Sequence, residues 1–314
     1  MFPWLVLALL AALSYLGTVP YRHLWVRTKG PGLTAKGYGA LLPFFIMAYA
    51  VAAGASQDAV WACAAISAMT AIYWIDDIGD LKVTVRLALQ FGAGALMAWL
   101  ALDGGTGNLP LPVPLACAIA GVANIGLTNV VNFYDGADLN ISTLLILLAA
   151  VMIGVPATNA DLMPIALTVL AFTLPFAFVN RKPGTLYFGD AGSFAVASLI
   201  TLVTVMGARD GDGTAALAAL PLLLPAMDVA YVFFLRVRRK EDLLSRNYHH
   251  LYQQLQIQRR GFWYLLPQPV FAAVLLAATL GLIGSGIRVL TAVVAASVIL
   301  TPILYFASRA MFLK

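Results

Sequence analysis

Residues 162–180 read LMPIALTVLAFTLPFAFVN, a stretch that contains no charged side chain. About 20 predominantly apolar residues are enough for a helix to cross the hydrocarbon core of a bilayer. The apolar positions are continuous rather than alternating, which favours a membrane helix and excludes a membrane β-barrel. The stretch therefore predicts a transmembrane helix.

Apolar runs of similar length occupy most of the chain. Of the 314 residues, 61% are hydrophobic and only 11% are charged, whereas about 25% of an ordinary soluble domain is charged. This composition excludes a soluble enzyme and a disordered chain. We expect one all-α integral membrane domain over residues 1–314, with about 10–11 spans. The eleven apolar runs lie at 2–19, 38–56, 59–75, 86–102, 113–131, 141–157, 162–180, 191–208, 215–235, 262–283 and 287–307.

Basic residues are divided unequally between the loops on alternate sides of these spans. One set, formed by 20–37, 76–86, 132–140, 181–190, 236–261 and the C-terminus, carries 17 of the 19 Lys and Arg. Lys and Arg accumulate on the cytoplasmic side of membrane proteins. We therefore expect this set to be cytoplasmic and the N-terminus to be outside. The first run lacks a basic start and a clear cleavage site, so we expect it to be retained.

Acidic residues gather in short strings within the predicted cytoplasmic loops. Asp76, Asp77 and Asp80 leave the third span together, and Arg86 and Gln90 follow one helical turn apart. Carboxylates at this spacing repel one another, so at a membrane surface they need a cation, a basic partner or a raised pKa. An isolated pair would equally well end a helix in solvent.

A second string has a polar residue at every third position, at Asn129, Asn132, Asp135 and Asp138. On a helix these positions make a slowly winding polar stripe. Amides near the end of an apolar span are costly without partners, and Gly136 permits a sharp break just after Asp135. The alternative is a hydrogen-bonded seam between helices that is capped by a turn.

Two further acids stand near or within apolar runs. Asp190 lies among small residues just before the eighth span. It is either the N-cap of that helix or part of a site where a ligand approaches the backbone closely and phosphate binds at the helix start. Asp228 lies inside the ninth span, where a carboxylate indicates function unless it pairs with a loop arginine such as Arg236.

The longest predicted cytoplasmic loop is basic and contains Arg246, His249 and His250. No cysteine lies nearby to complete a zinc site, while guanidinium and imidazole groups suit phosphate oxygens. A basic face suits anionic headgroups and nucleotide phosphates, and nothing further in the sequence supports nucleic-acid binding. Acids gathered beside basic loops on one face predict a Mg²⁺-carboxylate site that faces a phosphate-binding surface.

At these residues the chain resembles the polyprenyl-phosphate N-acetylhexosamine-1-phosphate transferases of the glycosyltransferase family 4 type. The resemblance begins weakly at the Gly-rich element Thr34-x-Lys36-Gly37-x-Gly39. The other matching motifs, in chain order, are Asp76-Asp77 with Arg86-Leu87-x-x-Gln90, Asn129-x-x-Asn132-Phe133-x-Asp135-Gly136-x-Asp138, Phe188-Gly189-Asp190-x-Gly192-Ser193 and His250-Leu251-Tyr252-Gln253.

The resemblance implies a multi-pass enzyme of the bacterial cytoplasmic (inner) membrane. Such an enzyme transfers an N-acetylhexosamine 1-phosphate from a UDP-sugar to undecaprenyl phosphate in the bilayer, with Mg²⁺, and releases UMP. By this resemblance Asp76, Asp77 and Asp135 are catalytic, and Asp190 and Asp77 bind the metal. The residues expected to bind substrate are Lys36, Arg86, Asn129, Asn132, Asp138, Arg246, His249 and His250. The sequence leaves open whether the enzyme is a homodimer.

Departures from the family pattern bear on the pathway. Asp80 stands where the peptidoglycan-precursor branch typically has Lys, and Leu139 replaces the usual second glycine after Asp138. The run from His250 to Gln253 leans toward the branch that starts O-antigen or exopolysaccharide assembly. We therefore expect an enzyme that initiates a lipid-linked cell-surface glycan.

The alternative from another class is a cation-coupled membrane transporter of anionic solutes. Substrate sites of transporters lie near the bilayer midplane. Here only Asp228 lies within a predicted span, and the other acidic strings lie at one predicted surface. This placement favours the transferase.

Overall fold

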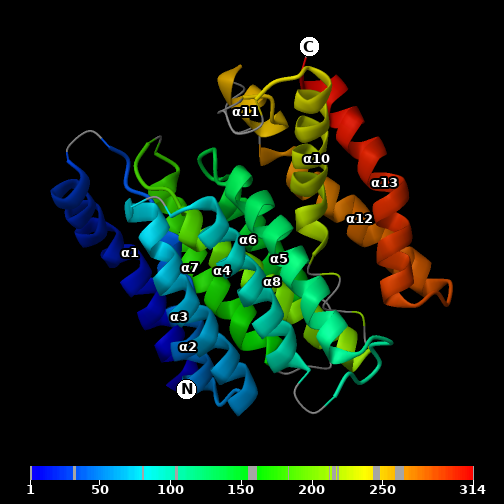
Figure 1. The fold of residues 1–314 in the computed structure, drawn as a ribbon, viewed down its shortest axis with the longest axis horizontal. Helices are drawn as coiled ribbons and strands as arrows, with labels where there is room; N and C mark the ends of the chain where they lie inside the picture. The colour runs from blue at the N-terminus through cyan, green and yellow to red at the C-terminus, as the bar shows by residue number, and fades with distance from the viewer. Residues whose placement is uncertain are drawn as a thin grey trace. The chain divides into compact units, whose positions relative to one another are not determined.

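The computed structural model describes most of the chain as helices (Figure 1). Within the described part of the chain the only β-type pairing is an isolated parallel bridge between Ala35 and Leu186. The residues described are 2–30, 33–79, 81–102, 105–154, 161–182, 184–211, 213, 217, 219–242, 248–258 and 265–313.

Nine helices of the described residues are long and apolar enough to cross a membrane. Two shorter apolar helices, Tyr38–Ala53 and Asn140–Ile153, complete a set of eleven. Each of the eleven predicted runs overlaps one member of this set, and the second and sixth runs overlap the two short helices. The predicted class, an all-α polytopic membrane protein, is confirmed.

The chain divides into two compact units, residues 1–218 and 219–314. The first unit contains a short 3₁₀ helix, η1 (Tyr38–Leu41), and eight α-helices. These are α1 (Phe2–Lys29), α2 (Leu42–Ala53), α3 (Gln57–Gly79), α4 (Val83–Ala101), α5 (Val113–Tyr134), α6 (Asn140–Gly154), α7 (Leu162–Asn180) and α8 (Asp190–Asp210).

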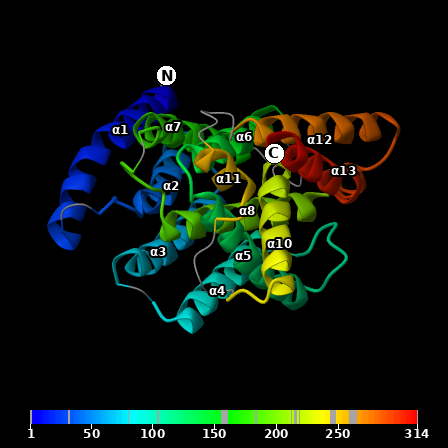
Figure 2. The ribbon, with the colours of Figure 1, turned by 90° about the horizontal axis from the view of Figure 1, so that it is seen from above.

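Helix α8 is the centre of the first unit, and α3, α4 and α5 pack around it (Figure 2). In its apolar window 83% of the residues are buried, against 17% in α1. Small residues let the surrounding helices approach closely. A Cβ on Gly94 of α4, for example, would lie only 2.4 Å from the carbonyl oxygen of Ala120 on α5. The helix that begins at Asp190 is therefore held firmly on several sides.

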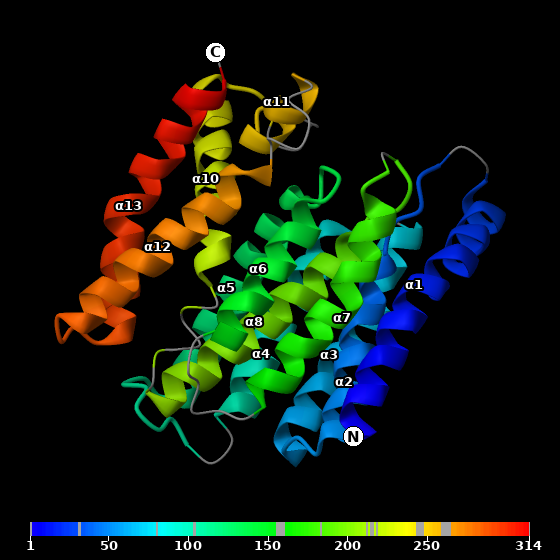
Figure 3. The same ribbon diagram turned by 180° about the vertical axis from the view of Figure 1, so that it is seen from behind.

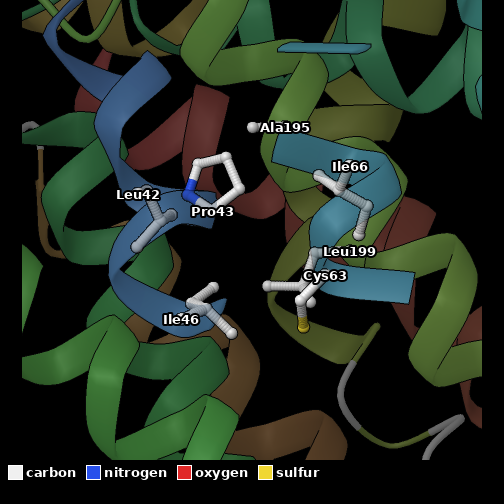
Figure 4. Close-up of a pocket in the computed structure, with 7 residues that line it drawn as sticks. All are labelled: Leu42, Pro43, Ile46, Cys63, Ile66, Ala195 and Leu199. Atoms are coloured by element: carbon white, nitrogen blue, oxygen red, sulfur yellow. The ribbon is translucent and has the colours of Figure 1, made fainter. Parts of the chain in front are cut away.

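The packing of the first unit leaves one small apolar cavity where α2, α3 and α8 meet (Figure 4). Its lining offers no polar side chain except the thiol of Cys63, so it is a packing void rather than a site for a phosphate. The residues around it are Leu42, Pro43, Ile46, Cys63, Ile66, Ala195 and Leu199.

The described residues of the second unit form a 3₁₀ turn and four α-helices, with α12 and α13 side by side (Figure 3). Helix α10 also packs against α13. The elements are η2 (Leu220–Leu222), α10 (Leu223–Arg238), α11 (Leu251–Ile257), α12 (Pro267–Gly284) and α13 (Val289–Phe312).

Candidate active site

The last turn of α3 carries two buried carboxylates, Asp76 and Asp77, which are 2% and 3% exposed. Oδ1 of Asp76 accepts a hydrogen bond of 2.7 Å from the backbone N–H of Leu81. Its Oδ2 lies 3.5 Å from a guanidinium nitrogen of Arg86 at the start of α4. The predicted phosphate-binding arginine therefore faces the first predicted catalytic aspartate across the turn between α3 and α4.

Asp77 binds the beginning of α8. Its two carboxylate oxygens accept the backbone N–H groups of Asp190 (3.2 Å) and Ala191 (3.0 Å). Such capping satisfies amides that have no partner within the helix. Nζ of Lys36 lies 3.6 Å from Oδ1 of Asp77, which brings the basic group of the Gly-rich element to the same carboxylate.

Asp135, directly after α5, binds the two preceding amides of the same segment. Its carboxylate accepts the backbone N–H groups of Phe188 (3.3 Å) and Gly189 (2.8 Å). Four consecutive amides, from 188 to 191, are thus accepted by two aspartates from different helices. The pKa of Asp135 is raised to about 8, chiefly by burial and also by the charges of Asp190 and Asp77, while the two amides lower it.

Asp190 completes this group of acids, which we call the acid cluster: Asp76, Asp77, Asp135 and Asp190. Asp190 is half-buried and lies close enough to each of the other three for their charges to interact. No hydrogen bond or ion pair joins its carboxylate to another described residue. The structure therefore brings together the acids of three strings that lie far apart in the sequence.

Of the two alternatives for Asp190, the side-chain N-cap is wrong. Asp190 is the first residue of the helix rather than a side-chain N-cap, and the amides at 190 and 191 are already taken by Asp77. The small residues also let another segment of the chain approach this helix start closely. A Cβ on Gly189, which has φ +87°, would lie 2.2 Å from the backbone nitrogen of Gly37.

The remaining residues of the second string take different positions. Asn129 is exposed, and its amide donates to the carbonyl oxygen of Ile125 on its own helix. Asn132 is half-buried on α5, while Asp138 is buried in the turn before α6. The predicted polar stripe therefore ends at the C-terminus of α5, and the turn after it carries Asp135 and Asp138.

Two residues absent from the sequence-based predictions position the acid cluster. Oδ1 of Asn180, at the end of α7, accepts the N–H of Leu139 at 2.6 Å, and its Nδ2 donates to the carbonyl oxygen of Leu186 at 2.8 Å. Tyr21 of α1 donates its hydroxyl to the carbonyl oxygen of Lys36 at 2.7 Å. The position of Asn180 at the end of an apolar span could have indicated such a role from the sequence. Nothing in the sequence around Tyr21 indicates it.

The second unit has a separate buried carboxylate, Asp228 of α10, which is 2% exposed. Its Oδ2 lies 2.9 Å from Nδ1 of His250. Its Oδ1 accepts the N–H of Leu251 (3.0 Å) and the hydroxyl of Tyr305 (2.7 Å), with Arg309 at 3.7 Å. We call these residues the Asp228 network.

The alternative for Asp228, a pairing with a loop arginine such as Arg236, is not what the structure shows, because the nearby arginine is Arg309 of α13. Arg236 lies 3.6 Å from Glu241 instead. Nε2 of His249 also lies 3.2 Å from Glu241, so the two histidines of the loop have different acidic partners. Arg246 and Asp80 lie outside the described residues.

The acid cluster suits a hard cation chemically. Among the described residues no three Asp, Glu, His or Cys side chains are grouped to hold a metal ion. Mg²⁺, however, is usually held by one or two carboxylates together with water and substrate phosphates. Asp190, which has no described partner, and Asp77, which amides hold in place, supply such oxygens.

Comparison with known proteins places the acid cluster inside a family region. Residues 59–208 match the family Glycosyl transferase family 4. That region contains all four acids of the cluster and none of the Asp228 network.

Curated relatives match part of the chain. A "Probable undecaprenyl-phosphate N-acetylglucosaminyl 1-phosphate transferase" of Bacillus subtilis is 22% identical over 193 residues, covering 58% of this chain and 53% of that protein. A "Phospho-N-acetylmuramoyl-pentapeptide-transferase" of Nostoc sp. is 28% identical over 208 residues, covering 58% and 56%. A protein of that name in Streptococcus suis is 31% identical over 83 residues, covering 26% and 25%. The chain thus spans about half the length, or less, of these relatives.

Proposed function

We propose that this chain transfers an N-acetylhexosamine 1-phosphate from a UDP-sugar to undecaprenyl phosphate and releases UMP. The observation that carries the proposal is the acid cluster, with Lys36 and Arg86 paired to two of its carboxylates. The family matched by residues 59–208 and the names of the relatives support the same reaction class.

The reaction joins two phosphates. An oxygen of the lipid phosphate attacks the β-phosphorus of the UDP-sugar, the bond from that phosphorus to the bridging oxygen breaks, and UMP leaves with the electron pair. The second pKa of a phosphomonoester is about 6, so the attacking group is mostly ionised at neutral pH. A strong base is therefore unnecessary, and the chain must chiefly position and neutralise the two substrates.

The basic residues supply part of that neutralisation. Lys36 and Arg86 are partly exposed partners of buried carboxylates and can turn toward phosphate oxygens, with the guanidinium offering two parallel donors. Asp76 has a buried Oδ2 that accepts no hydrogen bond from the described residues. That oxygen can accept a residual proton from the lipid phosphate or hold it through Arg86.

A magnesium ion would be held by Asp190 and Asp77, and it would neutralise the diphosphate and assist the departure of UMP. Asp135 acts differently. Its buried carboxylate holds the amides of Phe188 and Gly189, and unlike Asp76 and Asp77 it pairs with no basic side chain of the described residues. We therefore assign Asp135 a positioning role in place of the catalytic role that the sequence predicts.

By the resemblance, His250, His249 and Arg246 of the second unit are proposed to bind the sugar diphosphate. Asp138, Asn129 and Asn132 of the first unit are proposed by the same resemblance to bind substrate. We further propose that the N-terminus is outside and the acid cluster cytoplasmic, in the bacterial inner membrane. The product would start a lipid-linked glycan of the O-antigen or exopolysaccharide type.

The test is isotope exchange with the purified chain. Labelled UMP should enter a UDP-N-acetylhexosamine only when undecaprenyl phosphate and Mg²⁺ are both present, because direct transfer must run forward to the lipid-linked product and then backward with the labelled UMP. A panel of UDP-N-acetylhexosamines then identifies the donor through the lipid-linked product. A transporter of anionic solutes would give no exchange with any donor, and that result would overturn the proposal.

A further inference from the structure

A cavity of about 360 Å³ opens on the first unit where the end of α1 meets two loops. Its volume lies in the range of roughly 300–1,000 Å³ that is usual for small-molecule sites. The loops are joined behind it by the bridge between Ala35 and Leu186, and the N–H of Tyr187 donates to the carbonyl oxygen of Ala35 at 2.8 Å. The cavity therefore has an ordered floor.

The polar lining of this cavity suits an anion. Arg22 and His23 of α1 line it, together with Thr34 and Thr185 of the two loops. None of the described lining residues is acidic. The Thr185 hydroxyl donates to the carbonyl oxygen of Lys182 at 2.5 Å, which places another basic residue in the adjoining turn. Guanidinium, imidazole and hydroxyl groups are all hydrogen-bond donors to phosphate oxygens.

Three apolar side chains of the lining are exposed. Val19, Val26 and Leu33 are 54%, 43% and 58% exposed and belong to the same cavity. Val19 and Val26 lie on a helix that is long and apolar enough to span a membrane. A free inorganic anion would gain no binding energy from contact with these apolar side chains. The glycerol and first methylenes of a lipid would instead cover them. Basic pockets at the ends of membrane helices suit lipid headgroups.

We propose that this cavity binds the phosphate headgroup of an anionic lipid, with Arg22 as the main phosphate contact. The proposal does not depend on the transferase reaction. The site adjoins the acid cluster through the backbone, because Lys36, the partner of Asp77, follows Ala35 directly. A bound lipid would therefore brace the two loops that carry Lys36 and Gly189.

The test is lipid binding to the full chain in detergent, measured by native mass spectrometry. Phosphatidylglycerol, undecaprenyl phosphate, phosphatidylcholine and inorganic phosphate are titrated separately. Arg22→Ala should weaken binding of the phosphate-headed anionic lipid about fivefold, the effect of one basic group near an anionic lipid surface. Arg27→Ala is the matched control, because Arg27 belongs to the last turn of the same helix but does not line the cavity.

The lipid arms identify the source of the phosphate. Selective binding of phosphatidylglycerol or of undecaprenyl phosphate, lost in Arg22→Ala and kept in Arg27→Ala, supports the proposal and names the ligand. Equal losses in both variants would show diffuse attraction to the helix end and overturn it. Binding of inorganic phosphate alone, or unchanged lipid occupancy in Arg22→Ala with a normal size-exclusion profile, would also overturn it.

Discussion

The acid cluster and the Asp228 network both bury carboxylates, but they hold different partners. In the acid cluster, Asp77 and Asp135 accept four consecutive backbone amides at the start of α8. In the second unit, the single carboxylate of Asp228 accepts hydrogen bonds from the amide of Leu251 and the hydroxyl of Tyr305, and it also contacts His250 and Arg309. The first arrangement fixes a stretch of backbone, and the second depends on one side chain.

Because of this difference, we expect the two regions to tolerate different substitutions. Backbone amides remain in place when one carboxylate is altered, so the acid cluster should survive conservative changes and fail when its loop cannot adopt its conformation. The Asp228 network should fail when its one acceptor is removed. Within the acid cluster, the carboxylate of Asp190 has no described partner. A carboxylate without a partner in the protein is expected to bind a ligand.

The largest expected effect is that of Asp228→Ala. The substitution should lower the free energy of unfolding by about 3–5 kcal/mol, because Tyr305, His250 and the amide of Leu251 lose their shared partner. Tyr305→Phe removes one hydrogen bond and should cost only about 1 kcal/mol. Thermal unfolding in detergent measures both. Equal melting temperatures for Asp228→Ala and wild type would show that the network does not hold the second unit.

The next effect is that of Gly189→Ala in the acid cluster. The new methyl group would meet the backbone of Gly37 in a left-handed conformation, at a cost of about 3 kcal/mol. Activity should fall with stability, since the amides at 188–191 move. Gly126→Ala on α5 is the control, because a Cβ there meets nothing within 4 Å. If both variants unfold at the same temperature, the close approach of the two loops is not required.

The pH dependence of stability should sharpen the assignment of Asp135. Its pKa of about 8 in the folded protein exceeds the value of about 4 in an unfolded chain. The folded state therefore binds more protons between these values, and the free energy of unfolding contributed by Asp135 decreases as pH rises from about 4 to 8. In EDTA, Asp135→Asn should reduce that decrease. If wild type and Asp135→Asn have the same pH profile of stability, Asp135 is not a group whose pKa is raised by folding.

The smallest effect concerns Leu139, which has φ +65° in the turn before α6. Leu139→Gly should be tolerated. Glycine relieves the strain of the left-handed conformation, about 1–2 kcal/mol, and this gain offsets the greater entropy that glycine gives the unfolded chain. Leu139→Val should destabilise the protein by about 1 kcal/mol, because β-branched residues disfavour this conformation. The melting temperatures of the two variants test this order. A valine variant more stable than the glycine variant would contradict the left-handed conformation of residue 139.

The sequence predicts the helices and the acids better than it predicts their partners. Continuous apolar runs identify the eleven apolar helices of the described residues, and Asp76, Asp77, Asp135 and Asp190 stand out as acids in an apolar chain. The capping of α8 by Asp77 joins residues 113 positions apart, and no local pattern encodes such a contact. Polar side chains within apolar spans, such as Tyr305, also look like ordinary helix residues until a buried acid faces them.

The most direct test of the acid cluster is the rate of sugar-phosphate transfer by Asp190→Asn. The substitution preserves size and removes the one carboxylate of the cluster that has no described partner. With undecaprenyl phosphate, the preferred UDP-N-acetylhexosamine and Mg²⁺, lipid-linked product should form on the order of 100-fold more slowly, at an unchanged melting temperature. Asp58→Asn, at the exposed first turn of α3, should keep the wild-type rate. A wild-type rate for Asp190→Asn would contradict the placement of the reaction at the acid cluster.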